Sequence, residues 1–113
     1  MTLTPEGCAA IYDALRAHQP FSKWKLPESD AIEFHVTRDR KVFGMYHYGD
    51  DHAITLSETV IGHWLTLSST MAHEMIHLYQ SIQGRQTRAE HNTEFRKLAS
   101  EVCREFGFDP RCF

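Results

Sequence analysis

Residues 62–84 read GHWLTLSSTMAHEMIHLYQSIQG, and their apolar side chains recur with a helical period. Spacings of three or four residues place these side chains on one stripe of an α-helix. The stripe consists of Trp64, Leu67, Met71, Met75, Leu78 and Ile82. Gly84 is suited to ending the helix. The stretch therefore predicts a long helix that begins near Gly62 and packs its stripe on a core.

The same stretch contains His73-Glu74-Met75-Ile76-His77, which fits the pattern His-Glu-x-x-His. Residues four apart on a helix lie one turn and about 40° apart, so both imidazoles can reach one ion. Glu74 lies about 100° around from His73, where its carboxylate can hold a metal-bound water without being a ligand. The pattern predicts a catalytic metal site. The alternative is a surface helix with two histidines and a solvated glutamate.

A catalytic zinc site needs a third protein ligand and leaves its fourth position to water. The candidates after the motif are Glu90, His91 and Glu94. His91 is the only histidine after the motif, and it stands where a second helix begins, after a connection that turns the chain back. We predict His91 as the third ligand, with Glu94 as its first substitute. The alternative is that His91 only caps or lines the start of that helix.

The residues before the motif predict one helix and three strands. Thr4 and Pro5 begin a helix that ends near His18, and residues 19–30 form a loop anchored by Phe21 and Trp24. Alternating apolar residues predict strands at Ala31–Thr37, Lys41–Tyr48 and His52–Ser57, joined by turns at 38–40 and 49–51. We expect these strands to form a three-stranded antiparallel sheet.

A last helix is predicted from roughly Glu90 to Phe106, with Gly107 as its stop. Either Thr87 with Glu90, or Asn92, can serve as its N-cap. One helix, three strands and two further helices predict an α+β fold.

The composition is that of a globular protein, with 113 residues, 42% hydrophobic and 24% charged. This length predicts a single domain over residues 1–113 and excludes a disordered or fibrous class. No apolar run is long enough to span a membrane, and the N-terminus has no signal-peptide pattern. The three cysteines form no Cys-x-x-Cys pair, so we expect a cytoplasmic protein with idle thiols. The sequence does not indicate an oligomeric state.

The motif and the later segment His91-Asn92-Thr93-Glu94-Phe95 together resemble the SprT-like (Spartan-type) zinc metallopeptidase domain of the zincin superfamily. The strand Ile54-Thr55-Leu56-Ser57 is also similar, and the resemblance covers about residues 52–107. It implies a minimal zincin-like domain with His73, His77 and His91 as zinc ligands and Glu74 as the catalytic carboxylate. It also implies that Phe95 packs to fix the second helix.

These observations predict a zinc-dependent metallopeptidase in which Glu74 is the general base acting on a zinc-bound water. The expected partner is a protein or peptide substrate, aligned on an edge strand that is either Lys41–Tyr48 or His52–Ser57. The candidates for stabilising the oxyanion are Tyr46, His47, Tyr48 and His52. The alternative is a zinc-binding scaffold of the same fold with little turnover. Association with nucleic acid is a third hypothesis, which the net charge of −3 does not support.

Eight histidines are present, and five of them have no ligand spacing. We expect these to be surface or structural residues: His18, His35, His47, His52 and His63. Tyr79 and Gln80 follow the motif, and they line the cleft, pack against another helix or are exposed to solvent. Four basic residues cluster near the two helices, and we interpret them as helix-end charges rather than a phosphate site: Arg85, Arg88, Arg96 and Lys97.

Overall fold

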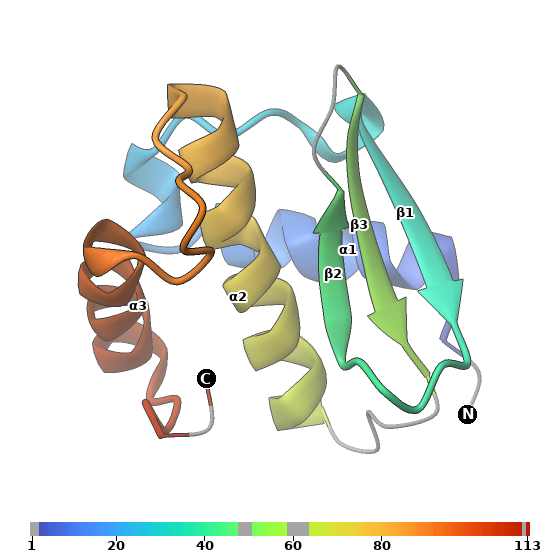
Figure 1. The fold of residues 1–113 in the computed structure, drawn as a ribbon. Helices are drawn as coiled ribbons and strands as arrows, with labels where there is room; N and C mark the ends of the chain where they lie inside the picture. The colour runs from blue at the N-terminus through green and yellow to red at the C-terminus, as the bar shows by residue number, and fades with distance from the viewer. Residues whose placement is uncertain (1–2, 48–50, 59–63, 112) are drawn as a thin grey trace.

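A computed structural model describes residues 3–47, 51–58, 64–111 and 113. Its elements are α1 (Pro5–Arg16), the short turns η1 (Phe21–Lys23) and η2 (Ser29–Ala31), β1 (Ile32–Thr37), β2 (Gly44–His47), β3 (His52–Ser57), α2 (Trp64–Gln83) and α3 (Thr93–Phe106). In Figure 1, α2 runs beside the β2 edge of the sheet, α1 crosses behind, and α3 lies on the other side of α2. The predicted α+β class is confirmed.

The sheet has the strand order β1-β3-β2, so β3 is its central strand. β1 pairs parallel to β3, with Ile32 opposite His52, and β2 pairs antiparallel to β3, with Gly44 opposite Leu56. Four of the six β3 residues are buried, as expected for a strand covered on both faces.

The predicted antiparallel sheet is therefore wrong, because the sheet is mixed. Consecutive strands are neighbours in roughly two-thirds of cases, and the prediction followed that rule. Here residues 38–43 carry the chain past the end of β3, where Ser57 Oγ donates to the Asp39 carbonyl at 2.8 Å and Ser57 N to the Phe43 carbonyl at 2.8 Å. The hairpin predicted at 38–40 is absent, and β2 begins only at Gly44.

The helix ends follow from their capping residues. Thr4 Oγ1 accepts a hydrogen bond from Gly7 N at 3.0 Å, which confirms the start of α1, although the helix ends at Arg16 rather than near His18. Asn92 Oδ1 accepts from Phe95 N at 2.9 Å, so Asn92 is the N-cap of α3 and the start at Glu90 is wrong. Gly84 and Gly107 follow α2 and α3 with φ values of 67° and 79°, as a left-handed helix end requires.

The core lies between α1, the sheet, α2 and α3. The middle of the α2 stripe is buried, from Leu67 to Leu78, whereas its ends are open, with Trp64 66% and Ile82 41% exposed. Phe21 is fully buried and Trp24 stacks on Tyr79, so the predicted anchoring of the 19–30 loop is confirmed. Among the described residues, no helix combines the length and apolar character needed to cross a bilayer.

Candidate metal centre

Three imidazoles converge between α2 and the start of α3. His73 and His77 lie one turn apart on α2, and His91 lies just before the Asn92 cap of α3. One ligand atom from each of the three lies within 4.8 Å of the others, and His73 Nε2 is 3.1 Å from His91 Nε2. The structure thus brings together the three histidines that the sequence suggested as ligands.

The Phe95 ring packs against all three imidazoles of this cluster. Its centroid lies 4.5 Å from that of His77, 4.6 Å from His91 and 4.9 Å from His73, and the side chain is buried. Because Phe95 stands in the first turn of α3, docking of this helix on α2 fixes all three imidazoles at once.

The donor set suits zinc. Two nitrogens bound to one tetrahedral zinc ion, each at about 2.0–2.1 Å, are about 3.3 Å apart, which is close to the His73–His91 separation. Burial, with His77 and His91 close by, lowers the pKa of His73 to about 3, and burial with His91 lowers the pKa of His77 to about 4. Both rings are therefore neutral at pH 7, which is the form that binds a metal.

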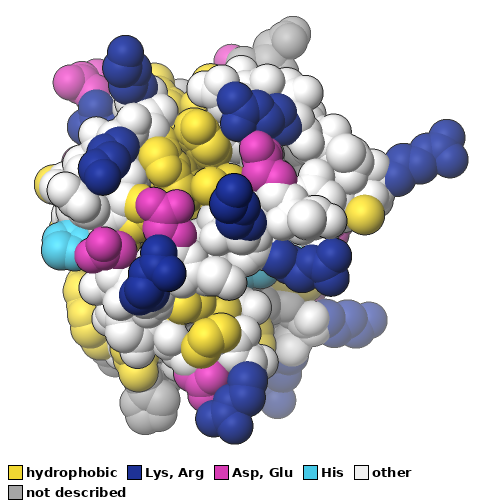
Figure 2. All heavy atoms as spheres, turned by 90° about the vertical axis from the view of Figure 1, so that its left-hand side faces the viewer, with side chains coloured by type: hydrophobic (Ala, Val, Ile, Leu, Met, Phe, Trp, Pro, Cys, Tyr) yellow, Lys and Arg dark blue, Asp and Glu magenta, His cyan; other side chains and the backbone are white. Residues whose placement is uncertain are grey.

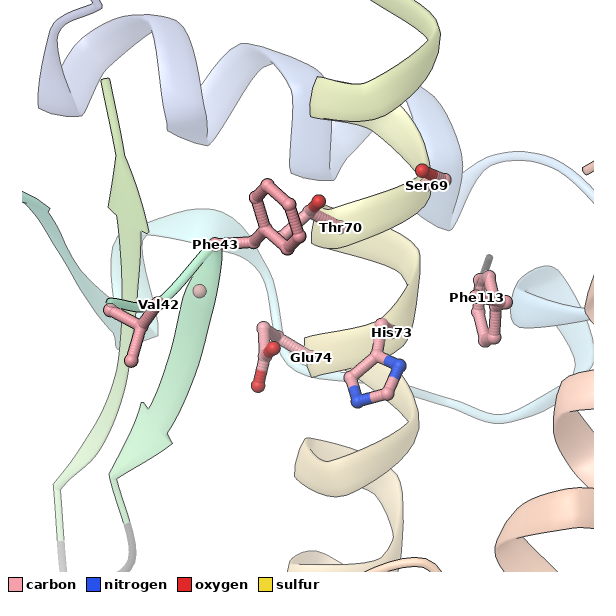
Figure 3. Close-up of a pocket in the computed structure, with 8 residues that line it drawn as sticks. Val42, Phe43, Ser69, Thr70, His73, Glu74 and Phe113 are labelled. Carbon is pink, nitrogen blue, oxygen red and sulfur yellow. The ribbon is translucent and has the colours of Figure 1, made fainter. Parts of the chain in front are cut away.

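Glu74 lies beside the cluster and points from α2 toward β2 (Figure 3). Its side chain is nearly buried, and burial raises the pKa of its carboxyl to about 8. The nearby charge of Glu90 raises this pKa further, while a hydrogen bond with the Tyr46 backbone lowers it. A raised pKa makes the carboxylate form of Glu74 a stronger proton acceptor than an exposed carboxylate.

Gly44 allows β2 to approach Glu74 closely. A Cβ atom at Gly44 would lie 2.8 Å from Thr70 Cγ2 and 3.2 Å from Glu74 Oε2. Glycine inside a strand often marks such a close approach, and this signal was present in the sequence. The strand therefore forms one wall of a cleft of about 570 Å³ that reaches His73, Glu74, His77 and His91.

A polar network holds the connection that carries His91. The buried Gln80 donates from Nε2 to Asn92 Oδ1 and to Glu94 Oε1, both at 3.0 Å. Arg85 Nη1 donates to Glu94 Oε2 at 2.9 Å. Gln80 thus packs rather than lining the cleft, and the sequence did not reveal its role because both of its partners lie on another segment.

Neither of the two carboxylates considered as substitutes for His91 lies among the converging ligand atoms. Both oxygens of Glu94 accept hydrogen bonds from Gln80 and Arg85. Glu90 is exposed on the wall of the cleft and does not belong to the group of converging ligand atoms. His91, and neither Glu90 nor Glu94, therefore lies where it can be the third donor beside His73 and His77.

Four other histidines have different contacts. His18 packs against Phe106, His35 lies 3.5 Å from Glu33, His47 Nε2 bonds Thr55 Oγ1, and His52 Nδ1 bonds the Tyr46 hydroxyl. Of the four oxyanion candidates, Tyr46 and His47 line the cleft, but the Tyr46 hydroxyl is paired with His52 and His47 Nε2 is paired with Thr55. His63 and Tyr48 lie outside the described residues.

The basic residues near α3 do not form a uniform patch. Arg85 pairs with Glu94, and Figure 2 shows Lys and Arg side chains interspersed with Asp, Glu and apolar ones on the side of the molecule where α3 lies. This mixture agrees with the interpretation of ordinary surface charge.

Comparison with known proteins adds one result. The sequence matches the profile of the SprT-like family over residues 12–112, which covers α1 from Tyr12 onward, the sheet, α2 and α3. No curated protein matches the chain.

Proposed function

The chain belongs to the SprT-like family, and on that premise we propose that it is a zinc-dependent metallopeptidase that hydrolyses peptide bonds. The family is associated with metallopeptidase-type domains, and the histidine cluster can hold a metal ion. The metal, the reaction and the roles of single residues are our proposals.

The observation that carries the proposal is the position of Glu74 beside the three histidines. A structural metal site needs ligands only, whereas this one has a nearly buried carboxyl group that opens onto the same cleft. Burying a carboxyl group costs free energy, so a buried carboxyl group beside a cleft is better explained by a role in the reaction than by stability. The arrangement fits a base that acts on a reacting molecule in the cleft.

In this mechanism His73, His77 and His91 would hold the zinc ion. The chemistry that a bound zinc ion would supply is that of a Lewis acid, which would polarise the scissile carbonyl and make water more acidic. Glu74 accepts a proton from the attacking water at a carboxylate oxygen and then returns it to the departing amine nitrogen.

β2 is the strand that aligns the substrate in this proposal. Of the two candidates, His52–Ser57 is excluded because β3 is the central strand, whereas β2 lies at the sheet edge next to α2. An extended substrate segment along the cleft lies between β2 and the histidines, in the manner of strand addition.

The test compares wild type with Glu74→Gln on an unfolded protein substrate, after zinc has been measured in each. We expect about one zinc per chain in both proteins and a loss of at least about a hundredfold in cleavage rate for the variant. Glu105→Gln, at an exposed position on α3, is the matched control and should cleave like wild type.

Two results would contradict the proposal, and a third would add a nucleic-acid partner to it. Equal cleavage by wild type and Glu74→Gln would remove Glu74 from its role. Stoichiometric zinc without cleavage of any unfolded substrate would favour a zinc-binding scaffold, and cleavage seen only with added DNA or RNA would favour a nucleic-acid-associated form.

A further inference from the structure

A second cavity adjoins the candidate metal centre on the side of the first turns of α2. One pocket, of about 260 Å³, is lined in part by His73 and Glu74, and this second cavity, of about 510 Å³, is lined in part by Leu65. Both are lined by Phe43, Ser69, Thr70 and Phe113. Figure 3 shows Phe43 beside Thr70, with Phe113 across the pocket on the far side of His73.

Four of the eight residues that line the second cavity are apolar: Phe43, Leu65, Phe108 and Phe113. The other four are Thr66, Ser69, Thr70 and Asp109. The hydroxyls of Ser69 and Thr70 are used within the helix, because both donate to the Thr66 carbonyl, at 3.1 Å and 2.7 Å. The carboxylate of Asp109, which also lines this cavity, accepts hydrogen bonds from Arg111. An apolar group therefore fits this cavity better than a charged one.

Exposed apolar side chains gather here. Phe43 is 55% and Leu65 62% exposed although both are large and apolar, and Met45, 44% exposed, lines the adjoining cleft. A group of exposed apolar side chains beside a polar centre marks a surface that binds something apolar. Ile82 is also exposed, but it lies near the other end of α2 and lines neither cavity.

We propose that the cavity between Phe43, Leu65 and Phe113 is a substrate subsite that takes a bulky apolar side chain beside the scissile bond. The inference rests on the proposed function. It commits to a substrate side chain because the cavity shares four lining residues, Phe43, Ser69, Thr70 and Phe113, with the pocket of Glu74 and His73. In an extended chain one residue advances about 3.3 Å, so the side chain that enters belongs to a residue within one or two positions of that bond.

Binding tests the subsite without relying on turnover. Two fluorescent ten-residue peptides, identical except that one has Phe where the other has Ser, are titrated against zinc-loaded Glu74→Gln protein by anisotropy. We expect the Phe peptide to bind roughly 10- to 100-fold more tightly. Equal affinities for the two peptides would overturn the inference.

Two variants test whether the preference for the Phe peptide arises in this cavity. Phe43→Ser and Leu65→Ser, each made in the Glu74→Gln protein, should reduce the Phe-over-Ser ratio by at least about fivefold, with zinc content unchanged. Ile82→Ser is the matched control, since it removes another exposed apolar side chain from α2, and it should leave the ratio intact. An effect of Ile82→Ser as large as that of Leu65→Ser would overturn the assignment.

Cleavage and sedimentation distinguish the remaining outcomes. Mapped cleavage sites in an unfolded protein should share a bulky apolar residue at one fixed position, and Leu65→Ser should relax that preference. If wild type binds the Phe peptide selectively but cleaves nothing, the peptidase proposal fails, and the cavity is a binding site for an apolar peptide side chain rather than a subsite beside a scissile bond. If Leu65→Ser instead converts a dimer to a monomer without changing the peptide ratio, a second copy covers this face and the inference fails.

Discussion

The two segments that supply the histidines are built in different ways. His73 and His77 lie within α2, a helix of 20 residues whose middle is buried, so their spacing is set by the helical backbone itself. His91 lies on the exposed connection 84–92, which has no regular structure of its own. Its position depends on the contacts of Gln80, Asn92 and Phe95.

This difference separates a local constraint from a tertiary one. The two α2 imidazoles stay close together as long as the helix is folded. The third imidazole joins them only when α3 docks on α2 and the polar network closes. Mutations in the connection should therefore weaken metal binding while leaving the helical content unchanged.

The largest expected effect is the loss of a ligand from either segment. Structural zinc sites bind with about 10–16 kcal/mol, so His77→Ala or His91→Ala should weaken zinc binding on the order of a thousandfold. Competition with a chromophoric chelator measures this affinity, and His35→Ala, a partly exposed strand residue, should change it less than twofold, by ~0.4 kcal/mol at most. Retention of zinc by His91→Ala would move the third ligand to Glu94 or Glu90.

The Phe95 ring contacts the histidines of both segments, and its removal should lower the free energy of unfolding more than any of the other substitutions. Phe95→Ala creates a cavity under all three imidazoles, and we expect the free energy of unfolding to fall by about 3–5 kcal/mol in the presence of chelator. Urea unfolding followed by circular dichroism measures this change. Phe43→Ala, at a half-exposed ring, should cost less than about 0.5 kcal/mol; equal losses would show that Phe95 is no support.

Disruption of the polar network should have an intermediate effect on stability and zinc binding, mainly by loosening the connection 84–92. Gln80→Leu removes two hydrogen bonds to the start of α3, and we expect about 1–2 kcal/mol less stability and roughly tenfold weaker zinc binding. Gln83→Leu, at an exposed position on the same helix, is the control. Unchanged zinc affinity in Gln80→Leu would mean that His91 is placed without this network.

The smallest effect is expected at the surface ion pair. Arg85 and Glu94 are both partly exposed, and such pairs contribute little in water. Arg85→Gln should change zinc affinity less than about twofold, with the difference disappearing at 1 M salt because exposed charges are screened. A large change that persists at high salt would show that Arg85 positions His91 in another way.

The sequence predicted the helices well because helices are local. The period of the α2 stripe, the cap at Thr4, and Gly84 and Gly107 as helix stops were all readable from neighbouring residues. It left the cap of α3 open between Thr87 with Glu90 and Asn92. The choice of Asn92 became clear only in the structure, where its side chain bonds both Gln80 and Phe95.

The sequence did not predict the sheet order because pairing between strands is not local. Alternation identified β1 and β3 but says nothing about which strand lies beside which. The mixed order decides the site, since it places β2, and not β3, at the edge next to Glu74. Gln80 was missed for the same reason, because its role depends on contacts with a distant segment. Gly44 was missed although a glycine in a predicted strand is a readable signal of close approach.

By itself the sequence determined α2, the motif His73–His77 with Glu74, and the choice of His91 as the candidate third donor, because residue type and helical spacing carry that information. Only the tertiary structure decided that the three imidazoles converge over Phe95 and that β2 forms the wall of the cleft. It also decided that an apolar cavity adjoins Glu74. The physical reason is that helical periodicity is fixed by backbone hydrogen bonds within one segment, whereas a site between segments depends on how their side chains pack.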